Sequence, residues 1–272
     1  MLIDFHTHVF PDKIAYRAIK KLEDGIIETQ GSLVLAPKTD GTLSALLSSM
    51  DKYGVDLSVV MPIATSPSQH TTINSFAKEI TDNKRIISFG SIHPMQEDWE
   101  ESLDHIAKIG LCGIKMHPEF QDFYVDEPVI CDIVKKCESL NLYILFHSGA
   151  DLGYHPPVHC TPQRLRNVLD KTACKNIIAA HFGGFMMWND VDKYLIGTSV
   201  MMDTSMTSGY LDRAQFKEML RKHGAAKILF GSDSPWQSPK ESLDFLMSLN
   251  LSDEENELIM HKNAEKLLFA LE

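Results

Sequence analysis

Several features that mark particular protein classes are missing from this sequence. None of the five cysteines belongs to a Cys-x-x-Cys pair, which argues against a zinc ribbon, a redox dithiol and a secreted disulfide scaffold. No lysine- or arginine-rich run appears, and 26 basic against 37 acidic residues give a net charge of −11, which disfavours nucleic acid as a partner. No apolar run approaches the ~20 residues of a membrane helix, and no basic head precedes the first apolar segment. We therefore expect a cytoplasmic protein with neither a membrane nor a nucleic acid as partner.

The composition and the length are those of a large globular domain. Hydrophobic residues make up 44% and charged residues 23% of the 272 residues. These fractions are close to the globular average, which excludes disordered, collagen-like and coiled-coil classes. We find no boundary or short repeat, so residues 1–272 are expected to form one domain.

Short β-branched segments alternate with longer amphipathic segments along the chain. Strands are predicted at Leu2–Phe5, Leu57–Met61, Ile86–Ile92, Gly113–Met116, Tyr143–Phe146, Ile177–Ala180, Val200–Asp203 and Ile228–Phe230. Helices are predicted at Thr42–Tyr53, Thr72–Ile80, Trp99–Ile109, Val129–Leu140, Pro162–Leu169, Asp190–Leu195, Leu211–Lys222 and Pro239–Leu249. Strand–helix alternation predicts parallel strands, and eight such units predict an α/β fold of the closed (β/α)8 TIM barrel type.

Two further segments extend this pattern. A long insertion, Val9–Asp40, follows the first strand and contains a helical pattern at Lys13–Leu22, then a polar loop from Gly25 onward. It is expected to lie over the barrel mouth as a lid, or to decorate the periphery. The last segment, Ser252–Leu271, begins at a Ser-x-x-Glu capping box and predicts a C-terminal helix.

Histidines gather at the predicted strand ends. Six of the twelve follow a strand directly: His6, His8, His93, His117, His147 and His181. Asp233 follows the eighth strand. Because all strand ends of a barrel point to one face, where loops build the active site, these side chains are expected to converge.

The convergent residues suit a metal ion. His6 and His8 are two residues apart, so in a strand both imidazoles point the same way. His147 would add a third nitrogen and Asp233 an oxygen, which suits zinc, with iron or manganese as alternatives. A lone His-x-His pair is often structural, but the joint pattern of four strand ends favours a metal. Such an ion lowers the pKa of a coordinated water toward ~7, Asp233 can accept the water proton, and His181 can polarise a carbonyl or steer a proton.

Five segments, spread over nearly the whole chain, resemble the motifs of a known protein family and occur in the same order as in that family. They are Ile3–His8, Gly113–Pro118, Phe146–Gly149, Ala180–Gly184 and Phe230–Trp236. With them the sequence resembles the amidohydrolase superfamily, in particular the amidohydrolase-2 branch that includes the aminocarboxymuconate-semialdehyde decarboxylase-like proteins. The resemblance implies a (β/α)8 barrel. It also implies metal ligation by His6, His8, His147 and Asp233, and a catalytic role for His181.

Other candidates lie near this set. Lys115 and His117 share one face of the fourth strand. In some branches of the superfamily a carboxylated lysine on this strand bridges two metals, but Lys115 lies a step too deep. We favour one metal ion, a buried Lys115 paired with an acid, and His117 as a substrate contact or a support for the ligands. Trp236 is a further pocket candidate, and Met186–Trp188 either walls the pocket or packs as a loop.

These residues predict a metal-dependent hydrolase that cleaves a C–O or C–N bond of a small ester, lactone or amide. The first alternative keeps the site and makes the protein a non-oxidative decarboxylase of a small unsaturated or aromatic carboxylic acid. That reaction needs a cation for the carboxylate, for which Arg17 and Arg164 are candidates. The second alternative is a non-catalytic metal-binding protein, which the complete residue set disfavours. The partner is a small-molecule substrate, and a homo-oligomer is compatible with the sequence.

Overall fold

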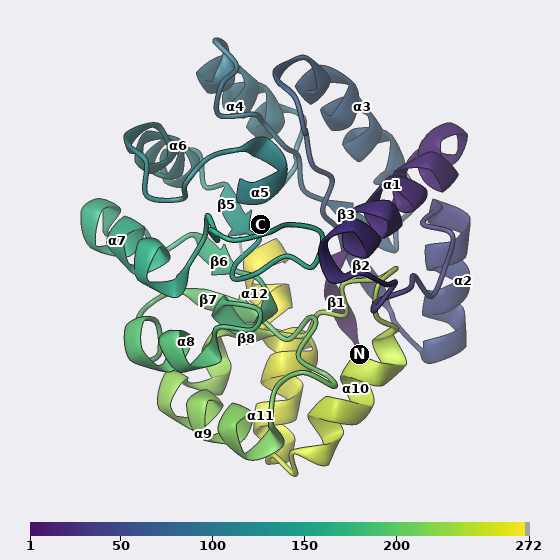
Figure 1. The fold of residues 1–272 in the computed structure, drawn as a ribbon, viewed down its shortest axis with the longest axis vertical. Coiled ribbons are helices and arrows are strands. Elements are labelled where there is room, and N and C mark those ends of the chain that lie inside the picture. Colours follow the sequence, from purple (N-terminus) through teal and green to yellow (C-terminus); the bar gives the residue numbers. More distant parts are fainter. Residues whose placement is uncertain (270–272) are drawn as a thin grey trace.

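Eight parallel strands form the centre of the molecule, as predicted (Figure 1). The computed structural model describes residues 1–269. The strands are β1 Ile3–Thr7, β2 Leu57–Val60, β3 Ile86–Ser88, β4 Gly113–Met116, β5 Tyr143–Phe146, β6 Ile177–Ala179, β7 Met201–Asp203 and β8 Ile228–Leu229. Each predicted strand is present within a few residues of its predicted bounds.

Helices surround the strands (Figure 1). They are α1 Asp12–Gln30, α2 Leu43–Tyr53, α3 His70–Ile80, α4 Trp99–Lys108, α5 Pro118–Gln121, α6 Pro128–Ser139, α7 Pro162–Thr172, α8 Trp188–Tyr194, α9 Arg213–His223, α10 Pro239–Ser248, α11 Asp253–Glu257 and α12 Asn263–Phe269. Short 3-10 turns occupy Pro67–Gln69, His181–Gly183 and Ala225–Lys227. Several helices begin where a side chain accepts a hydrogen bond from the first turn, as Thr161, Asp212 and Ser238 do. Within residues 1–269, no helix is long and apolar enough to cross a bilayer.

The strands close into a ring. Regular pairing joins β1–β2–β3 and β4–β5–β6–β7–β8 as two parallel sheets. At one seam, the Gly90 N–H donates to the Gly113 carbonyl (2.8 Å) and the Lys115 N–H donates to the Gly90 carbonyl (2.9 Å). At the other seam, the Phe5 N–H donates to the Phe230 carbonyl (2.8 Å). These bonds join the edges of both sheets, and the (β/α)8 barrel is confirmed.

Both faces of the strands are buried, which explains their continuous apolar runs. On β5, Ile144 and Phe146 belong to a large outer cluster that includes the helices, whereas Leu145 belongs to a smaller inner cluster. Ala264 and Leu267 of α12 complete the inner cluster. The C-terminal helix therefore packs against the interior side of the ring (Figure 1).

The insertion after β1 differs from its prediction. α1 runs from Asp12 to Gln30 and includes Gly25, which we placed in a loop. The prediction was wrong because the buried stripe of Ile19 and Ile26 continues across the glycine, and this burial outweighs its low helix propensity. The Gln30 side chain donates to the carbonyl of Leu152 (3.0 Å) in the loop after β5. The insertion therefore reaches a loop at the carboxyl ends of the strands.

The C-terminal segment is also less regular than predicted. Ser252 and Glu255 form the expected capping box, but a π-helical turn, Leu258–Lys262, separates α11 from α12. Inside that turn the carbonyl of Ile259 accepts a hydrogen bond from the Phe230 N–H (2.9 Å) at the end of β8. The π-helical turn therefore supplies a backbone hydrogen-bond acceptor to the residue that follows β8. Residues 270 and 271 of the predicted helix lie outside the described residues.

The acid stability of the fold is expected to depend on His223, the last residue of α9. Its buried ring donates from Nε2 to the carbonyl of Val200 (2.8 Å), and its Nδ1 accepts from the Gly197 N–H (3.2 Å). Burial, with a smaller contribution from Lys227, lowers its pKa from 6.5 to about 4. The folded state therefore holds this imidazole neutral.

Because the folded pKa lies below the unfolded one, His223 costs stability as the pH falls from 6.5 toward 4. The loss at pH 5 should be about 2 kcal/mol. Urea unfolding of the parent and of His223→Gln at pH 7.5 and pH 5.0 measures it. The parent should lose about 2 kcal/mol more than the variant between the two pH values, and equal losses would show that His223 does not titrate in this way.

Candidate metal centre

Strand ends bring the predicted site residues together. They come from β1 and the residue that follows it (His6 and His8), from the residues after β5 and β6 (His147 and His181), and from the loop after β8 (Asp233). His181 and Asp233 have left-handed backbones, with φ of +58° and +67°. Such φ values are uncommon outside glycine, and strain of this kind concentrates at functional sites.

Three of these residues converge on one point. The His6 Nε2 and His8 Nε2 atoms are 3.2 Å apart, and Asp233 Oδ1 lies 3.3 Å from the first and 3.1 Å from the second. Ligands about 2.1 Å from a tetrahedral ion are about 3.4 Å apart. The separations of the three atoms are close to that value.

The hydrogen bonds around the two imidazoles fix which nitrogens face this point. His8 Nδ1 lies 2.8 Å from the carbonyl of Met61, and His6 Nδ1 lies 2.8 Å from the Asp203 carboxylate. Both partners only accept, so both Nδ1 atoms carry hydrogen and both Nε2 atoms present lone pairs. Together with Asp233 Oδ1, three acceptor atoms face one another. The chemistry of this set fits a divalent cation.

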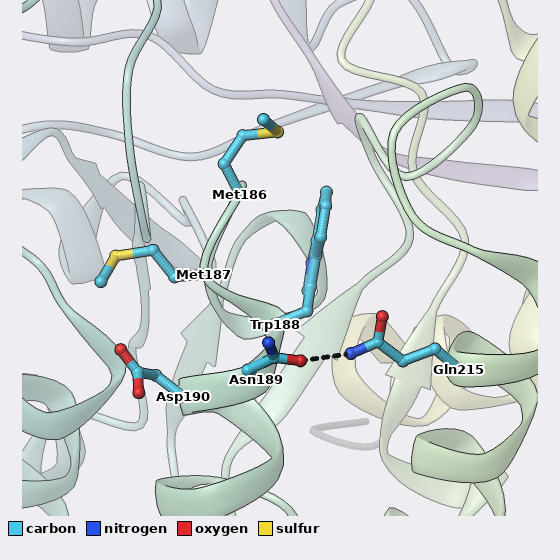
Figure 2. A pocket seen from close by; sticks show the side chains of 6 residues that line it. All are labelled: Met186, Met187, Trp188, Asn189, Asp190 and Gln215. Atoms are coloured by element: carbon cyan, nitrogen blue, oxygen red, sulfur yellow. Dashed lines mark hydrogen bonds between the residues drawn. The ribbon is translucent and has the colours of Figure 1, made fainter.

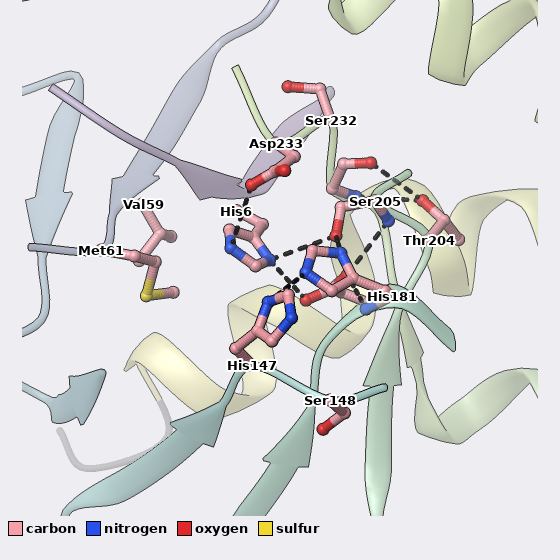
Figure 3. A network of polar contacts seen from close by, with 12 residues as sticks. His6, Val59, Met61, His147, Ser148, His181, Thr204, Ser205, Ser232 and Asp233 are labelled. Carbon is pink, nitrogen blue, oxygen red and sulfur yellow. Dashed lines mark hydrogen bonds and ion pairs between the residues drawn. The ribbon is translucent and has the colours of Figure 1, made fainter. Parts of the chain in front are cut away.

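The rings of His181 and His147 lie close to His6, as Figure 3 shows. The His181 ring stacks on His6, with ring centroids 5.2 Å apart, and its Nε2 is 3.0 Å from His147 Nδ1. His147 Nε2 is 3.2 Å from the carbonyl of Ala150. His147 therefore contacts His181 and Ala150 and not the converging atoms of His6, His8 and Asp233. Its ligation of the same ion stays a prediction.

Lys115 is buried as predicted, but its partner differs. Its Nζ lies 3.2 Å from His6 Nε2, whereas we expected an ion pair with an acid. Burial lowers the pKa of Lys115 to about 8, and Asp233 and Asp203 oppose the shift. The amine therefore stays mostly protonated near pH 7, and it places one positive charge beside the three acceptor atoms.

His117 lies on the other side of His147. The two rings stack with centroids 4.1 Å apart, and His117 Nε2 is 3.2 Å from Asp151 Oδ2. His117, His147 and Asp151 form a second group whose ligand atoms lie within 4.8 Å of one another. The structure thus places His117 beside a predicted ligand, and it adds Asp151.

Burial also sets the charge of the imidazoles. It is the largest cause that lowers the pKa of His6, His117, His147 and His181 well below 6.5. Nearby charges add to the shift, since Lys115 disfavours a second positive charge on His6. These four rings are neutral near pH 7, which is the form that ligates metals and accepts protons.

Sequence reasoning missed two buried aspartates and a serine. Asp203 is fully buried, and its carboxylate contacts His6 and the backbone of His181. The Ser205 hydroxyl contacts the imidazole rings of His6 and His181. Asp4 accepts from the Ser232 N–H (2.9 Å) and hydroxyl (2.5 Å), next to Asp233, and burial raises its pKa to about 7. The sequence feature that could have indicated Asp4 and Asp203 is an acidic residue inside an apolar strand or at its end.

The two remaining predictions concern the pocket walls. Trp236 is partly buried against the core, and its backbone N–H donates to the Asp233 carbonyl (2.8 Å). A groove of about 360 Å³ is lined by Met186, Met187, Trp188, Asn189, Asp190 and Gln215. Figure 2 shows these side chains. No predicted metal ligand lines it. The indole of Trp188 donates to the carbonyl of His181 (3.2 Å). This segment therefore supports the backbone of His181, the predicted catalytic residue, and does not line the group of His6, His8 and Asp233.

Close contact between two loops holds His147 and His181 together. The Phe185 N–H donates to the carbonyl of Ser148, and the Ala150 N–H donates to the carbonyl of Phe185 (2.9 Å each). Between them lies Gly149, with φ of +87°, where a Cβ would come within 2.2 Å of the Phe185 nitrogen. Only glycine fits here.

Gly149→Ala should therefore lower the free energy of unfolding by about 3 kcal/mol or more, because backbone strain adds to overlap. Gly197→Ala is the matched control, since φ is +83° there but no atom lies within 4 Å. It should cost only ~1–2 kcal/mol. Urea unfolding midpoints compare the two, and equal losses would mean that the close approach of the loops is unimportant.

A parallel eight-stranded barrel whose strand ends gather neutral histidines and a carboxylate with converging acceptor atoms is typical of a class of metal-dependent barrel enzymes. The family model described as amidohydrolase matches residues 3–270. The chain therefore belongs to the amidohydrolase family, which confirms the resemblance found in the sequence. As predicted, it is an enzyme of a family that contains metal-dependent hydrolases and decarboxylases.

Solved structures share the fold. An uncharacterised TIM-barrel protein from Bordetella bronchiseptica is 18% identical, with 98% of each chain covered and a TM-score of 0.76. A 5-carboxyvanillate decarboxylase from Novosphingobium aromaticivorans, complexed with manganese and a nitrobenzoic acid, is 15% identical (98% and 96% covered, TM-score 0.72). A probable 2-pyrone-4,6-dicarboxylic acid hydrolase from Acinetobacter baumannii is 16% identical (98% of each covered, TM-score 0.67). No curated protein sequence matches the chain significantly.

Proposed function

We propose that this chain is a hydrolase that cleaves a small ester, lactone or amide with one divalent metal ion. The observation that carries the proposal is the convergence of His6 Nε2, His8 Nε2 and Asp233 Oδ1 at 3.1–3.3 Å. His147 is the proposed fourth ligand. When bound, the ion supplies a water of lowered pKa beside a polarised carbonyl.

The residues of the chain would divide the remaining work. Asp233 directs Oδ1 to the two imidazoles, which leaves Oδ2 to accept a proton from water and pass it to the leaving group. His181, neutral and buried, is proposed to take up a proton at Nε2 and return it. His117 and Lys115 lie within reach of the same space and are proposed substrate contacts. Trp236 is proposed as a pocket wall.

Zinc is the proposed metal because imidazole and carboxylate ligands at tetrahedral separations suit it. Manganese is the first alternative, since two structural neighbours bind it. Elemental analysis of protein purified without added metal decides between them. About one zinc per chain supports the proposal, and two metals per chain would contradict a single centre.

A substrate panel tests the reaction. Esters, lactones and amides should be assayed beside unsaturated and aromatic carboxylic acids, with the parent and His181→Asn. Hydrolysis by the parent that falls by about 10²-fold or more in the variant supports the proposal. Carbon dioxide release without ester or amide cleavage would contradict it.

One observation favours decarboxylation as the second candidate. Lys115 is a buried cation beside the centre, and a carboxylate substrate would give it a partner. The arginines considered for this task are poorly placed. Arg17 is exposed, and Arg164 pairs with Asp126 at 2.6 Å. If this candidate holds, Lys115→Met should raise KM for the acid far more than it lowers kcat.

The matched segment, residues 3–270, supports a single catalytic domain over residues 1–272, which we propose. We also propose a cytoplasmic location. All five cysteines are free thiols, which suits a reducing compartment.

A further inference from the structure

Ser205 occupies the centre of a polar network behind the metal-binding group (Figure 3). It lies two residues after the end of β7 and is fully buried. Its Oγ lies 2.8 Å from His181 Nδ1 and 3.2 Å from His6 Nδ1, and it makes a short hydrogen bond to Asp203 Oδ1. One hydroxyl thus contacts both imidazoles and the carboxylate between them.

The direction of each hydrogen bond follows from the number of hydrogens available. The Asp203 carboxylate also accepts from His6 Nδ1 (2.8 Å) and from the backbone N–H groups of His181 (3.1 Å) and Ser205 (3.0 Å). A serine hydroxyl carries one hydrogen, and an ionised carboxylate can only accept, so the contact between the two assigns this hydrogen to the carboxylate. The serine oxygen then has only lone pairs left for His181, so His181 Nδ1 must be the donor.

We propose that Ser205 is a positioning residue that holds His181 in its Nδ1–H tautomer, with the Nε2 lone pair turned toward His147. This proposal rests on the proposed function, in which His181 acts through Nε2. Asp203 orients His6 directly and His181 through the serine hydroxyl. One buried carboxylate therefore sets the tautomers of two site imidazoles.

The same chain of bonds reaches His147. In the proposed arrangement His181 Nε2 accepts from His147 Nδ1 across 3.0 Å, and His147 Nε2 keeps a lone pair and gives up its hydrogen bond to the carbonyl of Ala150 (3.2 Å). That nitrogen is the atom that a cation needs from this ring. The serine thus favours the ligating form of a residue that it does not touch.

A competing arrangement uses the same distances. His147 Nε2 donates to the carbonyl of Ala150 (3.2 Å), His181 Nε2 donates to His147 Nδ1, and the Ser205 hydroxyl turns to His181 Nδ1. The carboxylate of Asp203 then loses the serine hydrogen. The two arrangements differ only in where three hydrogens lie. Removing the hydroxyl removes the acceptor for His181 Nδ1–H, so a buried N–H would be left unpaired and the competing arrangement should dominate.

Nitrogen-15 NMR of the histidine side chains tests the proposal on the full chain reconstituted with zinc, a diamagnetic ion. The His181 signals are assigned by their loss in His181→Gln. In the parent, His181 Nδ1 should show the shift of a protonated nitrogen and Nε2 that of a bare one. This measurement needs no Ser205 variant, and a protonated Nε2 in the parent overturns the proposal.

Three variants complete the test. Measured on the metal-free full chain, where no ion fixes the His147 ring, Ser205→Ala should move His181 toward the Nε2–H tautomer, and Ser205→Thr, which keeps a hydroxyl, should restore the parent pattern. Thr207→Val is the matched control, because Thr207 is buried and its hydroxyl bonds only to the carbonyl of Thr204 (2.6 Å). An unchanged His181 tautomer in Ser205→Ala would overturn the proposal. If that variant fails to fold, Ser205→Gly replaces it under the same criterion.

The tautomer readout is independent of turnover, so the two proposals can fail separately. A blank substrate panel with the expected tautomer contradicts only the proposed function. Once a substrate is known, Ser205→Ala should lower kcat by about 10- to 100-fold with little change in KM.

Discussion

Asp233→Asn is expected to lower kcat by at least about 10³-fold, because one substitution removes two contributions. The carboxylate places one oxygen beside His6 Nε2 and His8 Nε2 as the proposed negative ligand atom, and its second oxygen is the proposed proton acceptor. An amide keeps the shape but is neutral and cannot accept a proton at working pH. Steady-state rates on the best substrate of the panel and the metal content per chain measure the two contributions.

The matched control is Asp192→Asn on α8, whose carboxylate forms an exposed ion pair with Lys222 (3.3 Å). It should stay within about twofold of the parent, since surface ion pairs contribute little. Asp151→Asn is the discriminating variant, because Asp151 belongs to the second group with His117 and His147. If Asp151→Asn loses the metal while Asp233→Asn retains both metal and turnover, the centre lies in the second group.

The barrel could be read from the sequence because its signals are local. Each strand is a short, mostly apolar run, and each long helix carries an apolar stripe, so alternation alone predicts the order of the elements. The seams of the ring, such as Phe5 to Phe230, follow from closure. Gly25 misled the prediction because helix propensity is local, whereas the burial of Ile26 on the same face is decided by the folded chain.

The candidate centre was partly readable for the same reason. His6, His8, His147, His181 and Asp233 stand at strand ends, and barrel topology brings strand ends together. Asp203 also stands at a strand end, but a lone aspartate there is ambiguous until its carboxylate is seen against His6 Nδ1. Ser205 carries no signal at all, since serine is common in loops. Its importance depends on three partners from distant parts of the chain.

Distances also separate residues that the sequence grouped. The sequence assigned His147 to the same shell as His6 and His8, yet the His181 ring contacts both His6 and His147. Lys115 was expected to meet an acid, and it meets a histidine nitrogen. Which of several convergent polar groups are neighbours depends on side-chain rotamers and burial, and strand order does not determine either.

Chelation is the second change with a large expected effect. Removing divalent metal should lower turnover by more than about 100-fold, because three acceptor atoms would then face one another with only Lys115 to offset them. Added zinc or manganese should restore the rate.

If the parent binds its metal with a free metal concentration about 1,000 times Kd, removing the metal lowers the free energy of unfolding by about 4 kcal/mol, or Tm by about 10 °C. Thermal unfolding with and without chelator therefore measures the centre even before a substrate is known.

Acid should act on the same centre in the same direction. Protons compete with the metal for the imidazole lone pairs, so lowering the pH favours release. Because burial holds the pKa of His6 well below 6.5, this histidine stays neutral through the weakly acidic range, and metal and activity should be lost together only at lower pH. Metal content after dialysis across a pH series, plotted beside the rate, tests this coupling. Full activity after the metal has left, by chelation or by acid, would mean that the convergence of His6, His8 and Asp233 serves the fold and not the reaction.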